Sequence, residues 1–218
     1  MRTISRAAIA VVAVLGLAAC STDDSTDATA TTSPTPSVSS TDSTQASPSA
    51  TVTPDTTEPT SEFVLPEGMV AGTDQATAYE ALMSPIGEYA AAATYQAIID
   101  KYGAVEPYVM ILSAEERHIS ALVRQLDRLG VDAPANPYLG KIVAPADLVT
   151  AAKTEANGEV LNAAMYDSLI SQSSDANLIR VFTNLQRAST DSHLPLFEAA
   201  AANGGTLTIE QMMDIQYG

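Results

Sequence analysis

One predicted helix carries a carboxylate and an imidazole on its apolar face. Ile111, Glu115, His118 and Leu122 follow a 4-3-4 spacing, which places them on one side of an α-helix. A carboxylate and an imidazole that point into a core are costly unless they pair or hold a metal ion. Glu-x-x-His is also the unit of carboxylate-bridged metal bundles, because side chains at i and i+3 converge on one ion. The segment therefore indicates a metal-ligand pair, and a hydrogen-bonded pair within an ordinary core is the alternative.

Further polar residues fall on predicted apolar stripes of three other helices. Glu88 shares a stripe with Tyr95, Glu159 shares one with Glu155, Asn162 and Tyr166, and His193 shares one with Phe182 and Leu196. At a helix N-terminus the helix dipole alone favours an acid such as Glu88, by about 0.3–1 kcal/mol. The candidate metal ligands are Glu88, Glu115, His118, Glu159 and His193. Carboxylate and imidazole ligands suit iron or manganese.

The elements that must position these residues are all helical. Apolar residues at helical spacing predict an all-α domain, an antiparallel four-helix bundle with mostly short connections. The long helices are expected at about residues 85–102, 107–129, 146–172 and 175–203, with shorter ones near 75–83 and 209–215. Ser84 is the expected cap of the first long helix, Pro85 its first turn and Gly103 its stop. Pro195 lies inside the last helix, where a proline frees a carbonyl and bends the axis.

A family resemblance joins several of these motifs. The segment Glu88–Tyr95, then Lys101-Tyr102-Gly103, then Glu115-x-x-His118 resembles the ferritin-like family catalogued as domain of unknown function 2202. Asn184–Ser189 followed by His193-Leu194 is similar to the family's last helix, and the whole resemblance covers residues 75–205. It implies a ferritin-like fold in which Glu88, Glu115 and His118 are the first half of a metal site.

The second half of the chain departs from the ferritin-like pattern, which takes one Glu from each of two helices and Glu-x-x-His from each of the other two. Thr190, not Glu, precedes His193 by three residues, and the nearest acid, Asp191, is turned away by one residue. On the third helix the expected acidic pair falls at Asn162-Ala163, with Glu159 one turn earlier. A two-metal site, a one-metal site and a site that has lost its metal all remain open.

Two classes of function fit these features. A metal site with open positions would allow oxidase or peroxide-consuming chemistry, although no catalytic residue is assigned. The alternative is a non-catalytic, metal-free bundle that binds a partner in the cell envelope. Metal storage inside a closed shell of subunits fits least, because the N-terminal residues predict a membrane anchor. A formal net charge of −16 argues against nucleic acid as a partner, because phosphate binding needs clustered Lys and Arg.

The N-terminus predicts export and lipidation. Arg2 and Arg6 precede an uncharged apolar run over residues 7–19, which is shorter than the roughly 20 residues of a transmembrane helix and is typical of a signal peptide. Leu17-Ala18-Ala19-Cys20 resembles the lipobox of bacterial lipoprotein precursors. Cys20 is the only cysteine, so disulfides are excluded within the chain, and an exported protein with a spare thiol is the alternative.

The chain then divides into three parts. Residues 1–19 are the expected signal peptide, residues 20–67 a lipid-anchored disordered linker rich in Ser, Thr and Pro, and residues 68–218 the helical bundle. The linker composition could not form a core. We therefore expect a domain held by acyl chains such as palmitate on lipidated Cys20, at the extracytoplasmic face of the cell membrane, with the membrane as its first partner.

Overall fold

The computed structural model describes residues 63–218, and among these it contains helices and no β-strand. In chain order they are α1 (Asp74–Met83), α2 (Glu88–Tyr102), α3 (Tyr108–Arg128), α4 (Leu148–Gln172), α5 (Ala176–Ala188), the π-helix η1 (Ser189–His193), α6 (Leu194–Ala202) and α7 (Ile209–Tyr217). The prediction of an all-α domain is confirmed. The predicted signal peptide, Cys20 and the linker up to residue 62 lie outside the described residues. Within residues 63–218, every helix is too short or too polar to cross a membrane.

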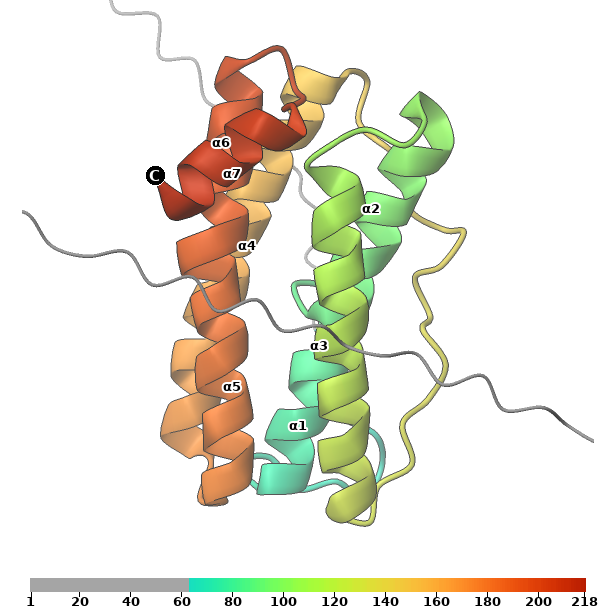
Figure 1. Ribbon diagram of the computed structural model, residues 1–218. Coiled ribbons are helices and arrows are strands. Elements are labelled where there is room, and N and C mark those ends of the chain that lie inside the picture. Colours follow the sequence, from blue (N-terminus) through green and yellow to red (C-terminus); the bar gives the residue numbers. More distant parts are fainter. Residues whose placement is uncertain (1–62) are drawn as a thin grey trace, which may run out of the picture. The chain divides into compact units, whose positions relative to one another are not determined.

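Two helix pairs lie side by side, as Figure 1 shows. α2 packs along α3, and α4 packs along α5, η1 and α6, while α1 lies between the pairs at one end and α7 against α6 at the other. The neighbours within each pair are antiparallel. The segment 129–147 returns along α2, where Tyr89 donates to the carbonyl of Pro134 and Tyr102 donates to that of Pro145. α3 and α4 therefore begin at the same end and run in the same direction.

The interior has two apolar clusters with a polar layer between them. One cluster is built around Leu82, Leu122, Tyr166, Leu169 and Phe182, and the other around Tyr95, Ile98, Ile111, Leu196 and Phe197. On α3, Glu115 lies between Ile111 of one cluster and Leu122 of the other. Because the other long helices alternate in the same way, their polar residues meet at one level of the domain.

The structure corrects the start of the first long helix. It begins at Glu88 with Gly87 as its N-cap, whereas Ser84 ends the preceding helix α1. A Cβ atom on Gly87 would lie 2.5 Å from the carbonyl oxygen of Ala81, so the tight turn between the two helices requires glycine. The expected cap at Ser84 and first turn at Pro85 are wrong, because that proline belongs to the turn.

The last long helix is not uniformly α-helical. η1 separates α5 from α6, and Pro195 follows it within the first turn of α6. Proline has no N–H to give to the carbonyl four residues before it, and its ring crowds that carbonyl. The wider π turn accommodates both effects while the chain continues in one direction.

The turn after α6 gives a test of the packing between chain segments. Gly205 has φ +95°, and a Cβ atom there would lie 2.3 Å from the carbonyl carbon of Leu148, whereas Gly204 (φ +79°) has nothing within 4 Å. Both Gly→Ala substitutions incur the left-handed strain of about 1–2 kcal/mol. We expect Gly205→Ala to lower the free energy of unfolding by about 1–3 kcal/mol more than Gly204→Ala, through overpacking. Urea denaturation measures both, and equal losses would contradict the close approach.

Candidate metal centre

The first group of ligand atoms joins α2 and α3. Nδ1 of His118 lies 3.3 Å from Oε2 of Glu88 and 3.1 Å from Oε2 of Glu115. Both carboxylates are buried, with 1% and 2% of their residue surface exposed. The Glu-x-x-His spacing on α3 thus converges as the sequence predicts, and the carboxylate at the start of α2 completes a group of three.

The second group joins α3, α4 and η1. Nδ1 of His193 lies 3.1 Å from Oε1 of Glu115 and 3.4 Å from Oε1 of Glu159. Glu115 therefore turns one carboxylate oxygen toward each histidine. The two imidazole rings stack with their centroids 5.5 Å apart. All five predicted residues meet in this single cluster, with Glu115 shared by both groups.

The donor set fits a metal ion in each group. Adjacent ligands on an octahedral ion with bonds of about 2.1 Å stand about 3 Å apart, close to the 3.1–3.4 Å between the imidazole and carboxylate atoms here. The ligand atoms of each group all lie within 4.8 Å of one another. Nδ1 of His193 is buried and, despite its near oxygens, makes no hydrogen bond. Buried polar atoms are nearly always satisfied, so this atom indicates a missing partner such as a cation.

Two buried tyrosines hold the carboxylates from outside. Tyr95 donates to Oε1 of Glu159 at 2.6 Å, and Tyr166 donates to Oε1 of Glu88 at 2.5 Å. Burial, followed by the charge of the bonded carboxylate, raises the pKa of each phenol well above its usual range. Both therefore remain donors. The bond from Tyr166 leaves Oε2 of Glu88 facing His118, whereas Oε1 of Glu159 both accepts from Tyr95 and faces His193. The position of both tyrosines on the predicted inner stripes was the sequence signal for this role, and the sequence did not separate it from ordinary packing.

Burial and mutual contact move the protonation equilibria of the cluster apart. Burial and the neighbouring Glu115 raise the pKa of Glu88 to about 7. Burial also disfavours the charged form of Glu115, but its close contacts with Glu88 and both histidines outweigh burial and hold its pKa well below the usual range. Burial alone would lower the pKa of each histidine, but the neighbouring carboxylates raise the pKa of His118 to about 9 and that of His193 to about 10. Without a metal ion, protons on the two imidazoles offset part of the buried negative charge.

The π turn decides which residue of the last helix faces the cluster. Thr190 and Asp191 are exposed, and Asp191 pairs with Arg187 at 3.5 Å on the surface. Ser189, four residues before His193, is the buried one and donates to Oδ1 of Asn162 at 2.9 Å. The Nδ2 of Asn162 donates in turn to the carbonyl of Ile86. A neutral pair therefore stands where the ferritin-like pattern would place carboxylates.

One buried carboxylate beside the cluster was not among the predicted ligands. Glu155, one turn before Glu159 on α4, is 6% exposed, and its Oε1 has no hydrogen-bond partner. Burial and then the neighbouring Glu159 raise its pKa to about 8. The sequence placed Glu155 on the inner face of α4, but the conventional ligand pattern gave it no role.

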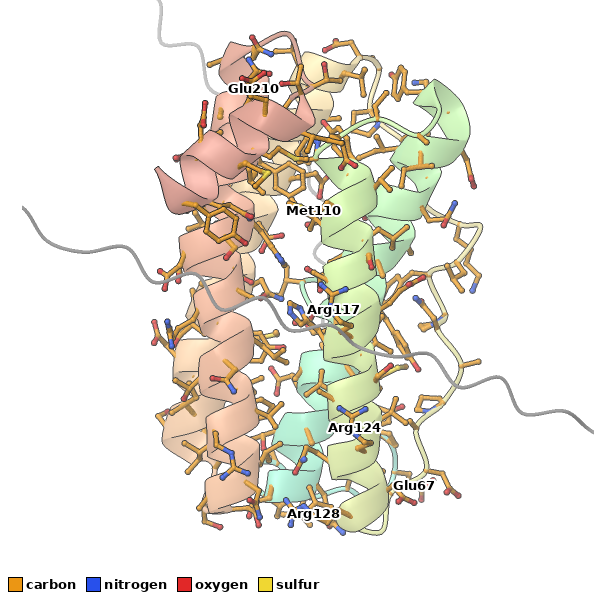
Figure 2. The ribbon with its side chains drawn as sticks, viewed as in Figure 1. Glu67, Met110, Arg117, Arg124, Arg128 and Glu210 are labelled. Carbon is orange, nitrogen blue, oxygen red and sulfur yellow. The ribbon has the colours of Figure 1, made fainter. Side chains whose placement is uncertain are left out.

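Two openings approach the cluster from different sides. A cavity of about 80 Å³ between α2 and α4 is lined by Glu115, Glu155, Glu159, Tyr95 and Asn162, among others. A groove of about 350 Å³ reaches both histidines from the side of α3 and α7, and is lined by Met110, Arg117 and Tyr217 among others. Figure 2 shows Met110 and Arg117 at successive levels along α3. Solvent species therefore have access to the carboxylate side and to the imidazole side.

Comparison with known proteins adds a fold relation. The chain matches no family model and none of the curated proteins. It is similar to the crystal structure of hypothetical protein MJ0754 from Methanococcus jannaschii DSM 2661, with 18% identity and a TM-score of 0.52. The likeness covers 72% of this chain and 98% of that one. At this identity it concerns the fold alone, and the resemblance to the ferritin-like family stays a prediction.

The pKa shifts predict how the metal-free protein responds to pH. The folded pKa values of His118 and His193 lie above the ordinary histidine value of 6.5, so the stabilisation that the two imidazoles give is full below about pH 6.5 and is lost as the pH rises through 9 to 10. Burial also raises the pKa values of Glu88 and Glu155, to about 7 and about 8, so folding opposes their ionisation. Their contribution to stability therefore also decreases as the pH rises above about 4.5. We expect the melting temperature of the metal-free protein to fall by several degrees between pH 5 and pH 10. A flat or rising profile in calorimetry would contradict the protonated cluster.

Proposed function

We propose that residues 68–218 form a ferritin-like four-helix bundle that binds iron or manganese between its helices. Glu88, Glu115 and His118 would hold one ion, and Glu115, Glu159 and His193 would provide the ligands of a second position. The observation that carries the proposal is the shared carboxylate of Glu115. Its Oε2 lies 3.1 Å from Nδ1 of His118, and its Oε1 lies 3.1 Å from Nδ1 of His193. The single long connection between α3 and α4 supports the fold, because ferritin-like bundles have one such crossover.

The balance of charge supports a metal ion over an ordinary polar core. Buried ion pairs recover their desolvation cost only when the geometry is good and the remaining polar atoms are satisfied. Here Nδ1 of His193 and Oε1 of Glu155 are buried without a hydrogen bond. A divalent cation would supply the positive charge that the imidazole protons supply in its absence, and it would engage the unpartnered nitrogen.

The ligand types define the chemistry that such an ion would bring. When bound to these carboxylates and imidazoles, iron or manganese would supply electron transfer with oxygen or peroxide, and oxidase or peroxide-consuming activity is what we propose. The chain's own part is to hold the ligands, through Tyr95 on Glu159 and Tyr166 on Glu88. The groove beside His118 and His193 gives a small oxidant access to the imidazole side.

A metal-free bundle that binds an envelope partner is the second candidate. The observation in its favour is that both histidines lie within 3.4 Å of carboxylates, so protonated imidazoles would neutralise part of the cluster. In that case Glu115 and His118 only maintain the fold, and the metal content would be unaffected by changing them.

Metal analysis of the full-length protein, purified without oxygen, separates the two candidates. We expect bound iron or manganese in the natural protein and a loss of affinity of at least about tenfold in Glu115→Gln, because both groups share this carboxylate. Glu116→Gln, an exposed neighbour on the same helix, is the matched control and should keep its metal. Near-zero iron and manganese in the natural protein, unchanged by Glu115→Gln, would remove the proposal.

We further propose that the domain is displayed outside the cell membrane on an acylated Cys20. A lone cysteine after an apolar segment supports this, and two or more acyl chains would anchor the protein stably. Mass spectrometry of the protein from membranes should show a diacylglycerol adduct on Cys20 at the N-terminus of the mature chain. Cys20→Ser should abolish the adduct. An unmodified cysteine in a membrane-free fraction would contradict the anchor.

A further inference from the structure

An unused carboxylate, Glu155, lies one turn before Glu159 on α4, outside the three residues whose ligand atoms lie within 4.8 Å of one another. Glu155 on α4 is only 6% exposed, and its Oε1 lacks any hydrogen-bond partner. The other buried glutamates of the layer, Glu88, Glu115 and Glu159, each contact a histidine or a tyrosine. An unpaired buried carboxylate is costly, and nothing among the described residues offsets it at Oε1.

The cavity between α2 and α4 brings this carboxylate to the cluster. Its wall includes Glu155 together with Glu115 and Glu159, and the last two are ligand candidates of the second group. The volume of about 80 Å³ is enough for roughly two water molecules, and therefore for a cation with part of its water shell. Gly158 lies on the same wall, where a Cβ atom would stand 3.8 Å from Oε2 of Glu155, so no larger side chain crowds the carboxylate.

The last helix does not provide a competing carboxylate. Ser189 is its buried residue at this level and is already bonded to Asn162, while Asp191 is on the surface. The second group therefore has two carboxylates and one imidazole, with space for a further acidic ligand on the cavity side.

We propose that Glu155 is the carboxylate ligand that completes the second metal position, together with Glu115, Glu159 and His193, for a divalent cation such as Mn²⁺. Glu155 is carried by the same helix as Glu159, one turn away, so α4 supplies two ligands where the last helix supplies only a histidine. The inference rests on the proposed metal function and assigns that function a second ion.

The surrounding charge indicates the route of the cation. The residues that line the cavity include three glutamates and no lysine or arginine, whereas the groove beside the two histidines is lined by Arg117 and by no acidic residue. A cation is attracted to the first opening and repelled from the second. Glu155 is therefore also placed to meet a cation that enters from the side of α2 and α4.

Counting Mn²⁺ ions per chain tests the assignment. The free ion gives an electron paramagnetic resonance signal that bound ions lose, so a titration of full-length protein yields both stoichiometry and affinity. We expect two ions in the natural protein. In Glu155→Gln we expect one ion with unchanged affinity and a second weakened at least tenfold. Glu198→Gln, an exposed glutamate on α6, is the matched control and should bind two.

Other outcomes separate this inference from the function on which it rests. Two ions bound equally well by Glu155→Gln, or the loss of both ions from a folded variant, would overturn the role of Glu155 and leave the metal function standing. A single ion in the natural protein would overturn the second position alone. No bound ion in the natural protein would overturn the proposed function itself, and this inference with it.

Thermal unfolding gives a readout that does not depend on counting. Without metal, Glu155→Gln should melt at the same temperature as the natural protein or higher, because the substitution removes an unpaired buried carboxylate. With saturating Mn²⁺ the variant should gain less than the natural protein. A lower melting temperature in the metal-free variant would indicate a merely structural role and overturn the assignment.

Discussion

The burial of acidic side chains between two apolar clusters is the constraint on which the rest of this structure depends. Glu88, Glu115, Glu155 and Glu159 are each at most 6% exposed, and taking a single ionised carboxylate out of water costs several kcal/mol. Two histidines and two tyrosines offset part of that cost through direct contacts. The offset is incomplete at two buried atoms, Nδ1 of His193 and Oε1 of Glu155, and this supports the proposed cation over internal pairing alone.

Several irregular features of the fold serve this layer. The π turn of η1 accommodates Pro195 and brings His193 and Ser189 inward while Thr190 faces solvent. The long connection along α2 starts α4 beside α3, where Tyr108 donates to the carbonyl of Leu148 at 3.2 Å. With α3 and α4 in the same direction, Glu115 and Glu159 arrive at one level. A uniform last helix or a short connection would separate these groups.

Much of the fold and the site follows from periodicity. The inner stripes predicted the helices to within a few residues, and they placed Glu88, Glu115, His118, Glu159 and His193 on faces that the structure brings together. Periodicity of 3.6 residues could not predict the π turn, and the Glu-x-x-His spacing of the ligand pattern points to Thr190, whereas Ser189 is the buried residue. It also could not show that Glu155 lacks a partner, because pairing depends on side chains from distant segments. The N-cap of α2 is Gly87 and not the predicted Ser84, because the backbone at this turn comes close to the carbonyl of Ala81. Only the folded chain shows this close approach.

A crystal of the protein soaked in Mn²⁺ would show whether the buried glutamates and histidines are metal ligands. Diffraction data collected at the manganese absorption edge locate the ion without reference to activity. We expect anomalous peaks within the cluster, one among Glu88, Glu115 and His118 and another beside Glu115, Glu159 and His193. A map with no peak among these residues, at Mn²⁺ concentrations that label surface carboxylates, would contradict this expectation.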